Sequence, residues 1–197
     1  MNRSVRIDTI FSFYQIIYML GREESLNLLK EYVKNPSLLN HCEMVAKAME
    51  AYAKKMDLPE AEVEEWYLSG LLHDLDWEMY PNEHPNKAIN EILPQKGYSQ
   101  TIIEAIKAHG PDRTGKHPET PIERYLFACD ELCGFLNASS LMRPDRFKGM
   151  EVNSIKKKLK DKRFAANVSR EDIAKGVELI GKTLDEHIEF LINVFSK

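Results

Sequence analysis

The sequence predicts an all-α protein that folds as a single-domain helical bundle over residues 1–197. Apolar residues recur at spacings of three and four in most segments, which is typical of amphipathic helices, whereas the alternation typical of strands is hard to find. Prolines and capping residues divide the chain into helices of ordinary length. A chain of 197 residues can bury one substantial core, and no internal repeat or linker indicates a second domain.

The first part of the chain predicts three helices. The first begins at Asp8, the second begins at Glu23 and ends at Asn35-Pro36, and the third runs from about Ser37 to Met56. His41 lies on the same stripe of the third helix as its apolar residues. We therefore expect His41 to face inward.

The rest of the chain contains several residue patterns that predict the start of a helix. A capping residue followed by a proline or a glutamate is typical of such a start. The predicted starts are Asp57-Leu58-Pro59-Glu60, His84-Pro85, Thr101 with Glu104, Thr120-Pro121-Ile122-Glu123, Ser169 and Thr183. The helix that begins at Thr120 should extend to about Leu141.

The composition excludes several classes of protein. With 43% hydrophobic and 29% charged residues the chain is typical of globular proteins, and its net charge of −4 argues against binding to a nucleic-acid polymer or a membrane surface. No apolar run reaches the roughly 18 residues of a membrane span. Three cysteines do not make a disulfide framework, so we expect a reducing, cytoplasmic location. Cys129 and Cys133 lie four apart, but buried small hydrophobes are a better interpretation than zinc ligands.

The fourth helix ends in residues that point to metal chemistry. An uncharged run over residues 66–72 leads directly into His73 and Asp74, and a similar run over residues 125–129 leads into Asp130. A buried carboxylate is costly unless it gains a proton, a cationic partner or a metal. With His41, these residues supply two imidazoles and two carboxylates from three helices.

Each of these residues alone has a simpler interpretation, as a hydrogen-bonded core histidine or a capping aspartate. Their combination favours a divalent ion, and the donor set suits Mn, Fe, Co, Ni or Zn without choosing among them. His84 and His109 are either surface residues or ligands of a second ion, in which case Asp74 would bridge the two ions. We take neither His117 nor His187 as a ligand.

The order His41, His73-Asp74, Asp130 on a helical chain resembles the HD superfamily of metal-dependent phosphohydrolases. The similarity covers a core of about residues 37–141, with N-terminal helices and a C-terminal helical extension packed on it. The longer pattern, which includes Glu83-His84-Pro85 and Ala108-His109, is similar to an uncharacterised bacterial subgroup of the HDIG type. One departure is Trp77, which stands where many members carry a lysine.

The resemblance implies a hydrolase of a small phosphate ester, a nucleotide-like phosphomonoester or phosphodiester, that uses one or two divalent ions and a metal-activated water. It implies catalytic roles for His73 and Asp74 and metal ligation by His41, His73, Asp74, His84, His109 and Asp130. A phosphate also needs a cationic clamp. The candidates are Arg143, Lys157 and Lys158, although the lysines are as well explained by a solvated helix face.

Two alternatives remain at this point. Some proteins of the same fold are di-iron oxygenases with a similar ligand pattern, and a regulatory module could bind a metal or a nucleotide without turnover. The expected partner is a small phosphorylated substrate, with no nucleic-acid polymer and no membrane, and a homodimer is possible.

Overall fold

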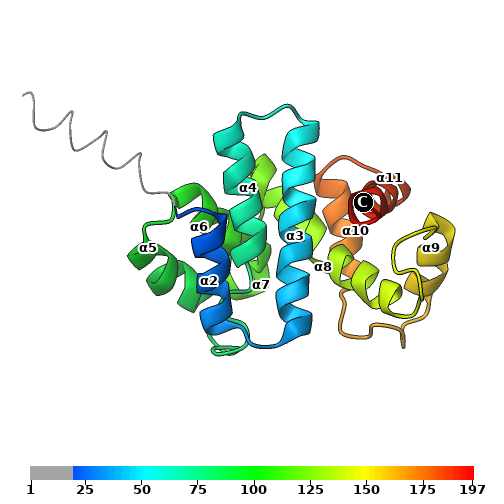
Figure 1. Cartoon of the computed structure of the whole chain (residues 1–197), viewed down its shortest axis with the longest axis horizontal. Helices are drawn as coiled ribbons and strands as arrows, with labels where there is room; N and C mark the ends of the chain where they lie inside the picture. The colour runs from blue at the N-terminus through cyan, green and yellow to red at the C-terminus, as the bar shows by residue number, and fades with distance from the viewer. Residues whose placement is uncertain (1–19) are drawn as a thin grey trace, which may run out of the picture.

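The computed structural model describes residues 20–197, and this part of the chain is all-α with no strand (Figure 1). The predicted fold class is thus confirmed, and the helix predicted at Asp8 lies outside the described residues. The elements are α2 (Arg22–Tyr32), α3 (Pro36–Lys55), α4 (Glu60–Leu72), the π-helix η1 (Ala88–Ile92), α5 (Leu93–Lys96), α6 (Gln100–His109), α7 (Pro111–Thr114), α8 (Pro121–Leu141), α9 (Val152–Lys160), α10 (Arg170–Leu179) and α11 (Leu184–Phe195).

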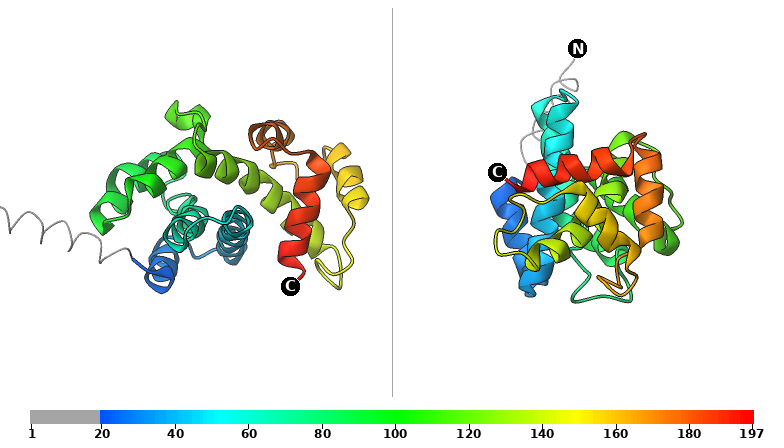
Figure 2. Two further views of the ribbon diagram at one scale, coloured as in Figure 1. Left: turned by 90° about the horizontal axis from the view of Figure 1, so that it is seen from above. Right: turned by 90° about the vertical axis from the view of Figure 1, so that its right-hand side faces the viewer.

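The core is built on α3, α4 and α8. Helices α3 and α4 lie side by side, and α8 packs against both and also against α6 and α10 (Figures 1 and 2). Close approach of α3 and α4 depends on Gly70, because a Cβ there would lie 2.8 Å from the backbone of Ala46. Fully buried side chains such as Tyr52, Leu72 and Phe135 fill the space between these helices.

The last three helices pack on the same core. Helix α10 contacts α8, and α11 contacts α3, α8, α9 and α10. The link to α11 is polar as well as apolar, since the buried His187 donates through Nε2 to the carbonyl of Ala128, and its Nδ1 accepts from the hydroxyl of Tyr52 at 2.7 Å. The organisation of residues 1–197 as one domain stays a prediction. No described helix is long and apolar enough to cross a lipid bilayer.

Several predicted helix starts are confirmed. Glu123 accepts the backbone N–H of Thr120 at the start of α8, as the capping box requires. The hydroxyls of Ser169 and Thr183 accept backbone N–H groups at the starts of α10 and α11.

Three predicted starts are wrong in detail. Asp57 has a positive φ of 54° and does not cap α4, for which Pro59 is the N-cap residue. The cap of α6 is Ser99 rather than Thr101, because the Ser99 hydroxyl reaches the N–H of Ile102. His84-Pro85 lies in a turn, and regular helix begins only after it. At α6 the sequence offers two hydroxyl residues close together, Ser99 and Thr101, and only Ser99 caps the helix.

Candidate metal centre

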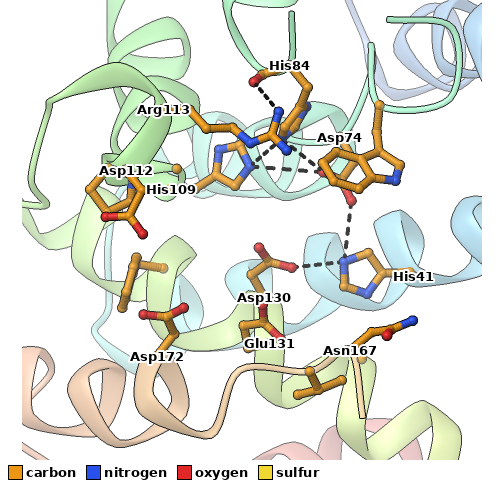
Figure 3. A pocket seen from close by; sticks show the side chains of 16 residues that line it. His41, Asp74, His84, His109, Asp112, Arg113, Asp130, Glu131, Asn167 and Asp172 are labelled. Carbon is orange, nitrogen blue, oxygen red and sulfur yellow. Dashed lines mark hydrogen bonds and ion pairs between the residues drawn. The ribbon is translucent and has the colours of Figure 1, made fainter. Parts of the chain in front are cut away.

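Three ligand-type side chains meet where α3, α4 and α8 converge. Figure 3 shows two of them, His41 and Asp130. His41 comes from α3, His73 ends α4, and Asp130 lies on α8. The Nε2 atom of His41 lies 3.2 Å from Nε2 of His73 and 2.9 Å from Oδ1 of Asp130. We call His41, His73 and Asp130 the first trio.

A second group lies beside the first. His84 precedes η1 and His109 ends α6, and their Nε2 atoms are 3.2 Å apart. Asp74 completes this second trio, with Oδ1 3.5 Å from Nε2 of His84 and 4.0 Å from Nε2 of His109. The structure therefore brings together all six residues expected as ligands.

Asp74 faces both trios. While its Oδ1 points to His84 and His109, its Oδ2 lies 3.3 Å from Nε2 of His73 and 3.7 Å from Nε2 of His41. A carboxylate with one oxygen toward each group is the arrangement needed to bridge two ions.

The outer nitrogens of three histidines are held by hydrogen bonds. Nδ1 of His73 donates to the carbonyl of Gly70 at 2.8 Å, and Nδ1 of His109 donates to the carbonyl of Ile106. Nδ1 of His84 donates to the buried carboxylate of Asp76 at 2.7 Å. These bonds hold a proton on Nδ1 and direct Nε2 inward, as in metal-ligating histidines.

The inward lone pairs make the cluster fit a metal. The Nε2 atoms of His84 and His109 face each other at 3.2 Å while both protons sit on Nδ1, so neither nitrogen donates to the other. Such lone pairs repel unless a cation lies between them. A mixed imidazole and carboxylate donor set suits Mn, Fe, Co, Ni or Zn.

The electrostatics support the same conclusion. Burial lowers the pKa of His109 to about 4, with the charge of His73 acting in the same direction, so its imidazole is neutral. Burial disfavours charge on His73 too, but the carboxylates of Asp74 and Asp130 hold its pKa well above the usual value, so Nε2 carries a proton that a bound cation would displace. Conversely, His73 lowers the pKa values of Asp74 and Asp130 despite their burial. Both carboxylates are therefore ionised and ready to bind a cation.

Comparison with known families agrees with this geometry. The model of the HD domain family matches residues 38–134, about half of the chain, from the N-terminal part of α3 to the middle of α8. The chain carries an HD domain. Domains of this family bind divalent metal ions and are generally metal-dependent phosphohydrolases, and the two trios of this HD domain supply side chains that could hold such ions. No curated protein and no solved structure matches the chain.

In this HD domain, side chains of both trios line a cavity of about 400 Å³. Trp77 and Arg113 lie on its wall beside the second trio, and Asp112 and Asp172 lie across the cavity from Asp74 (Figure 3). Trp77 occupies the position at which many HD proteins carry a lysine. Its indole packs edge-on against the ring of His84.

Arg113 is a site residue that sequence reasoning missed. Its Nη1 donates to the carbonyls of Pro81 and His84, and its guanidinium lies over the indole of Trp77. The residue lies in the short helix α7, within a segment that reads as a loop in the sequence. Its position four residues after His109 is a signal that could have found it.

The structure does not bring Arg143, Lys157 or Lys158 to this cavity. The guanidinium of Arg143 donates instead to the carbonyls of Arg146 and Lys148, in the turn that follows α8. Lys157 is exposed on α9, and Lys158 lies near the ring of Phe164. The end of α8 is three turns beyond Asp130, too far along the helix for Arg143 to reach the cluster.

The remaining candidate residues lie elsewhere. Cys129 and Cys133 are buried free thiols, and neither belongs to a described cluster of ligand-type residues. Burial raises the pKa of Cys129 well above its usual value, as expected for a small core residue. His117 and His187 also lie outside both trios.

Proposed function

We propose that this protein is a metal-dependent hydrolase of a small phosphate ester. The observation that carries the proposal is the position of Asp74, which directs one carboxylate oxygen to each trio at the base of an open cavity. The HD family supports hydrolysis as the reaction class.

The six cluster residues would hold up to two divalent ions, with His41, His73 and Asp130 on one side and His84 and His109 on the other. When bound, such ions lower the pKa of a water molecule and polarise phosphoryl oxygens. Asp74 accepts a hydrogen bond from the attacking water and orients it toward phosphorus. Nε2 of His73 lies 3.3 Å from Oδ2 of Asp74, so the two side chains could bind the same ion.

Arg113 is the cationic residue best placed to bind the phosphate, and it takes the role expected for Arg143. Of the described residues that line the cavity it is the only arginine or lysine. The carbonyls of Pro81 and His84 engage Nη1 alone, so Nε and Nη2 remain available to an anion. A guanidinium held in this way is preorganised for two parallel hydrogen bonds to a phosphate.

The opposite wall of the cavity limits the leaving group. Asp112 and Asp172 line it together with Glu131, whose pKa burial raises to about 7. No described lysine or arginine lies within ion-pair distance of Asp112 or Asp172. Like charges repel in a partly buried site. We therefore expect monoesters with an uncharged or cationic leaving group to be better substrates than nucleoside polyphosphates.

The proposal is tested by hydrolysis assays on protein loaded separately with Mn, Co, Ni, Zn or, without oxygen, Fe. The panel compares alkyl and sugar monophosphates, aminoalkyl monophosphates, phosphodiesters and nucleoside triphosphates. We expect release of inorganic phosphate by the wild type, and loss of activity with weaker metal binding in Asp74→Asn. Asp145→Asn removes an exposed carboxylate outside the cavity and should change neither.

A protein that binds metal but hydrolyses no member of the panel would contradict the proposal. Four histidines and two aspartates also suit a pair of iron ions, so oxygen uptake with two irons per chain would favour an oxygenase instead. Tight binding of a phosphate ester without product would favour a regulatory module.

A further inference from the structure

A second cavity, of about 610 Å³, lies between the start of α3, the end of α8 and the end of α11. The two helices that carry His41 and Asp130 thus form part of its wall, but neither of these residues lines it. We call it the α3–α8–α11 cavity. Its volume is within the range of small-molecule sites.

The floor of this cavity is apolar. Met44, Phe147 and Phe195 contribute large side chains, and the rings of Phe147 and Phe195 pack with centroids 5.1 Å apart. Leu141, on the edge, is 58% exposed, an unusual state for a leucine at the end of a buried helix. Apolar surface of this extent in a concave site is typical of ligand binding.

The charge around the floor has one sign. Lys47, Arg146 and Lys197 line the cavity, and no aspartate or glutamate side chain does. None of the three cations forms an ion pair with a described residue. The contrast with the metal-site cavity is clear, since that cavity has one arginine and five carboxylates on its wall. In a chain with a net charge of −4, a cavity without acidic side chains favours an anion.

Hydrogen bonds hold the turn that carries Arg146 on the cationic side of the cavity. Arg143 donates to the carbonyls of Arg146 and Lys148, and Arg146 itself has a positive φ of 52°. The hydroxyl of Ser196 lies 2.7 Å from the carbonyl of Ile192 and 3.2 Å from that of Phe147, so the end of α11 lies against the same turn. Arg143, which sequence reasoning assigned to the substrate, thus fixes the turn that presents Arg146 and Phe147.

We propose that the α3–α8–α11 cavity binds an amphipathic anion, a small molecule with an apolar chain and a carboxylate head group. The chain contacts the floor formed by Met44, Phe147 and Phe195, and the carboxylate pairs with Lys47 and Arg146. The site is separate from the metal cluster, and the proposal does not depend on the reaction catalysed there.

Calorimetric titration with three probes tests the chemistry: octanoate, octyltrimethylammonium and acetate, each below its aggregation concentration. We expect one octanoate per chain, no detectable binding of acetate, and binding of octyltrimethylammonium about tenfold weaker or less. Equal affinity for the two octyl probes would overturn the assignment of an anion. Equal affinity for acetate and octanoate would overturn the role of the apolar floor.

Charge-reversal variants test the location. Lys47→Glu/Arg146→Glu should weaken octanoate binding by about tenfold or more. Lys160→Glu/Lys162→Glu changes the net charge of the protein equally at exposed positions outside the cavity, and should leave binding intact. Equal loss in both double variants would show a general charge effect and refute the site.

The same titrations with vesicles of anionic lipid separate a soluble ligand from a membrane surface. Binding to vesicles that depends on Lys47 and Arg146, without binding of octanoate, would overturn the proposal in favour of a membrane contact. Dimerisation that is abolished by Leu141→Asp but not by Met142→Asp, again without octanoate binding, would overturn it in favour of a second copy of the chain.

Discussion

Asp74 is the residue on which the proposed metal site depends, because it faces both trios. The other five candidate ligands each belong to one trio, and the outer nitrogens of His73, His84 and His109 are fixed by hydrogen bonds. Asp76 fixes the orientation of one candidate ligand, His84. It is fully buried, and its two oxygens accept from Nδ1 of His84 and from the backbone N–H of Ala88.

Asp76→Asn should weaken binding at the second trio by about tenfold to a hundredfold while the first trio keeps its ion. The amide still accepts one hydrogen bond but no longer supplies the negative charge that orients His84 and raises the basicity of its Nε2. Metal titration followed by calorimetry would measure the two affinities separately. Equal weakening at both trios would contradict the positioning role.

Arg113→Gln should lower kcat/KM for phosphate monoesters by about tenfold to a hundredfold, because a charged hydrogen bond to the phosphate is lost. Metal content should not change, since the Arg113 guanidinium contacts no ligand nitrogen. The matched control is Arg143→Gln, which removes a guanidinium outside the metal-site cavity. A loss of activity in the control and not in Arg113→Gln would reverse the assignment.

Much of the site could be predicted from the sequence because histidine and aspartate at the ends of uncharged runs are conspicuous. His41 and Asp130 lie on helices whose inward faces follow from periodicity, and His73 and Asp74 directly follow the apolar end of α4. Arg113 could not be found in this way, since it lies in a segment rich in glycine and proline, and only the fold brings that segment against His84.

At the scale of elements, the close contact of α3 with α4 sets the distance between His41 and His73. Gly70 makes that contact possible and also accepts the hydrogen bond from Nδ1 of His73. Of the three helix starts that are wrong, Asp57 and Thr101 lie away from the candidate ligands, whereas His84-Pro85 contains one of them. The helices that carry the cluster were predicted with nearly correct bounds.

Gly70→Ala should destabilise the protein by about 1–3 kcal/mol, because the added methyl group would meet the backbone of α3 and force the two helices apart. Gly134→Ala is the control on α8, where a Cβ finds only ordinary contacts at 3.8 Å or more. Better helix propensity should stabilise that variant by about 0.5–1 kcal/mol. Chemical denaturation would measure both, and equal stability of the two variants would contradict the close packing of α3 on α4.

For the whole molecule, the buried His187 links the stability of the fold to pH. Burial lowers its pKa to about 4 from an ordinary value of 6.5. The unfolded chain therefore takes up a proton between pH 6.5 and 4 that the folded protein does not. This contribution to stability is complete above pH 6.5 and is lost as the pH falls.

We expect the free energy of unfolding to fall by up to about 3 kcal/mol over this range on account of His187. Other groups titrate here as well, so the quantity to measure is the difference between the wild type and His187→Gln by denaturant unfolding at several pH values. The variant should show a flatter dependence on pH. Parallel curves would show that His187 does not titrate as its burial requires.

Metal stoichiometry tests directly whether Asp74 joins two ion sites. Elemental analysis of protein purified without chelator and then equilibrated with Mn or Zn should give two ions per chain. The double variant His84→Ala/His109→Ala should keep one ion, and Asp74→Ala should lose the second ion and bind the first weakly. A wild type that binds no ion, or a double variant that keeps two, would contradict the account.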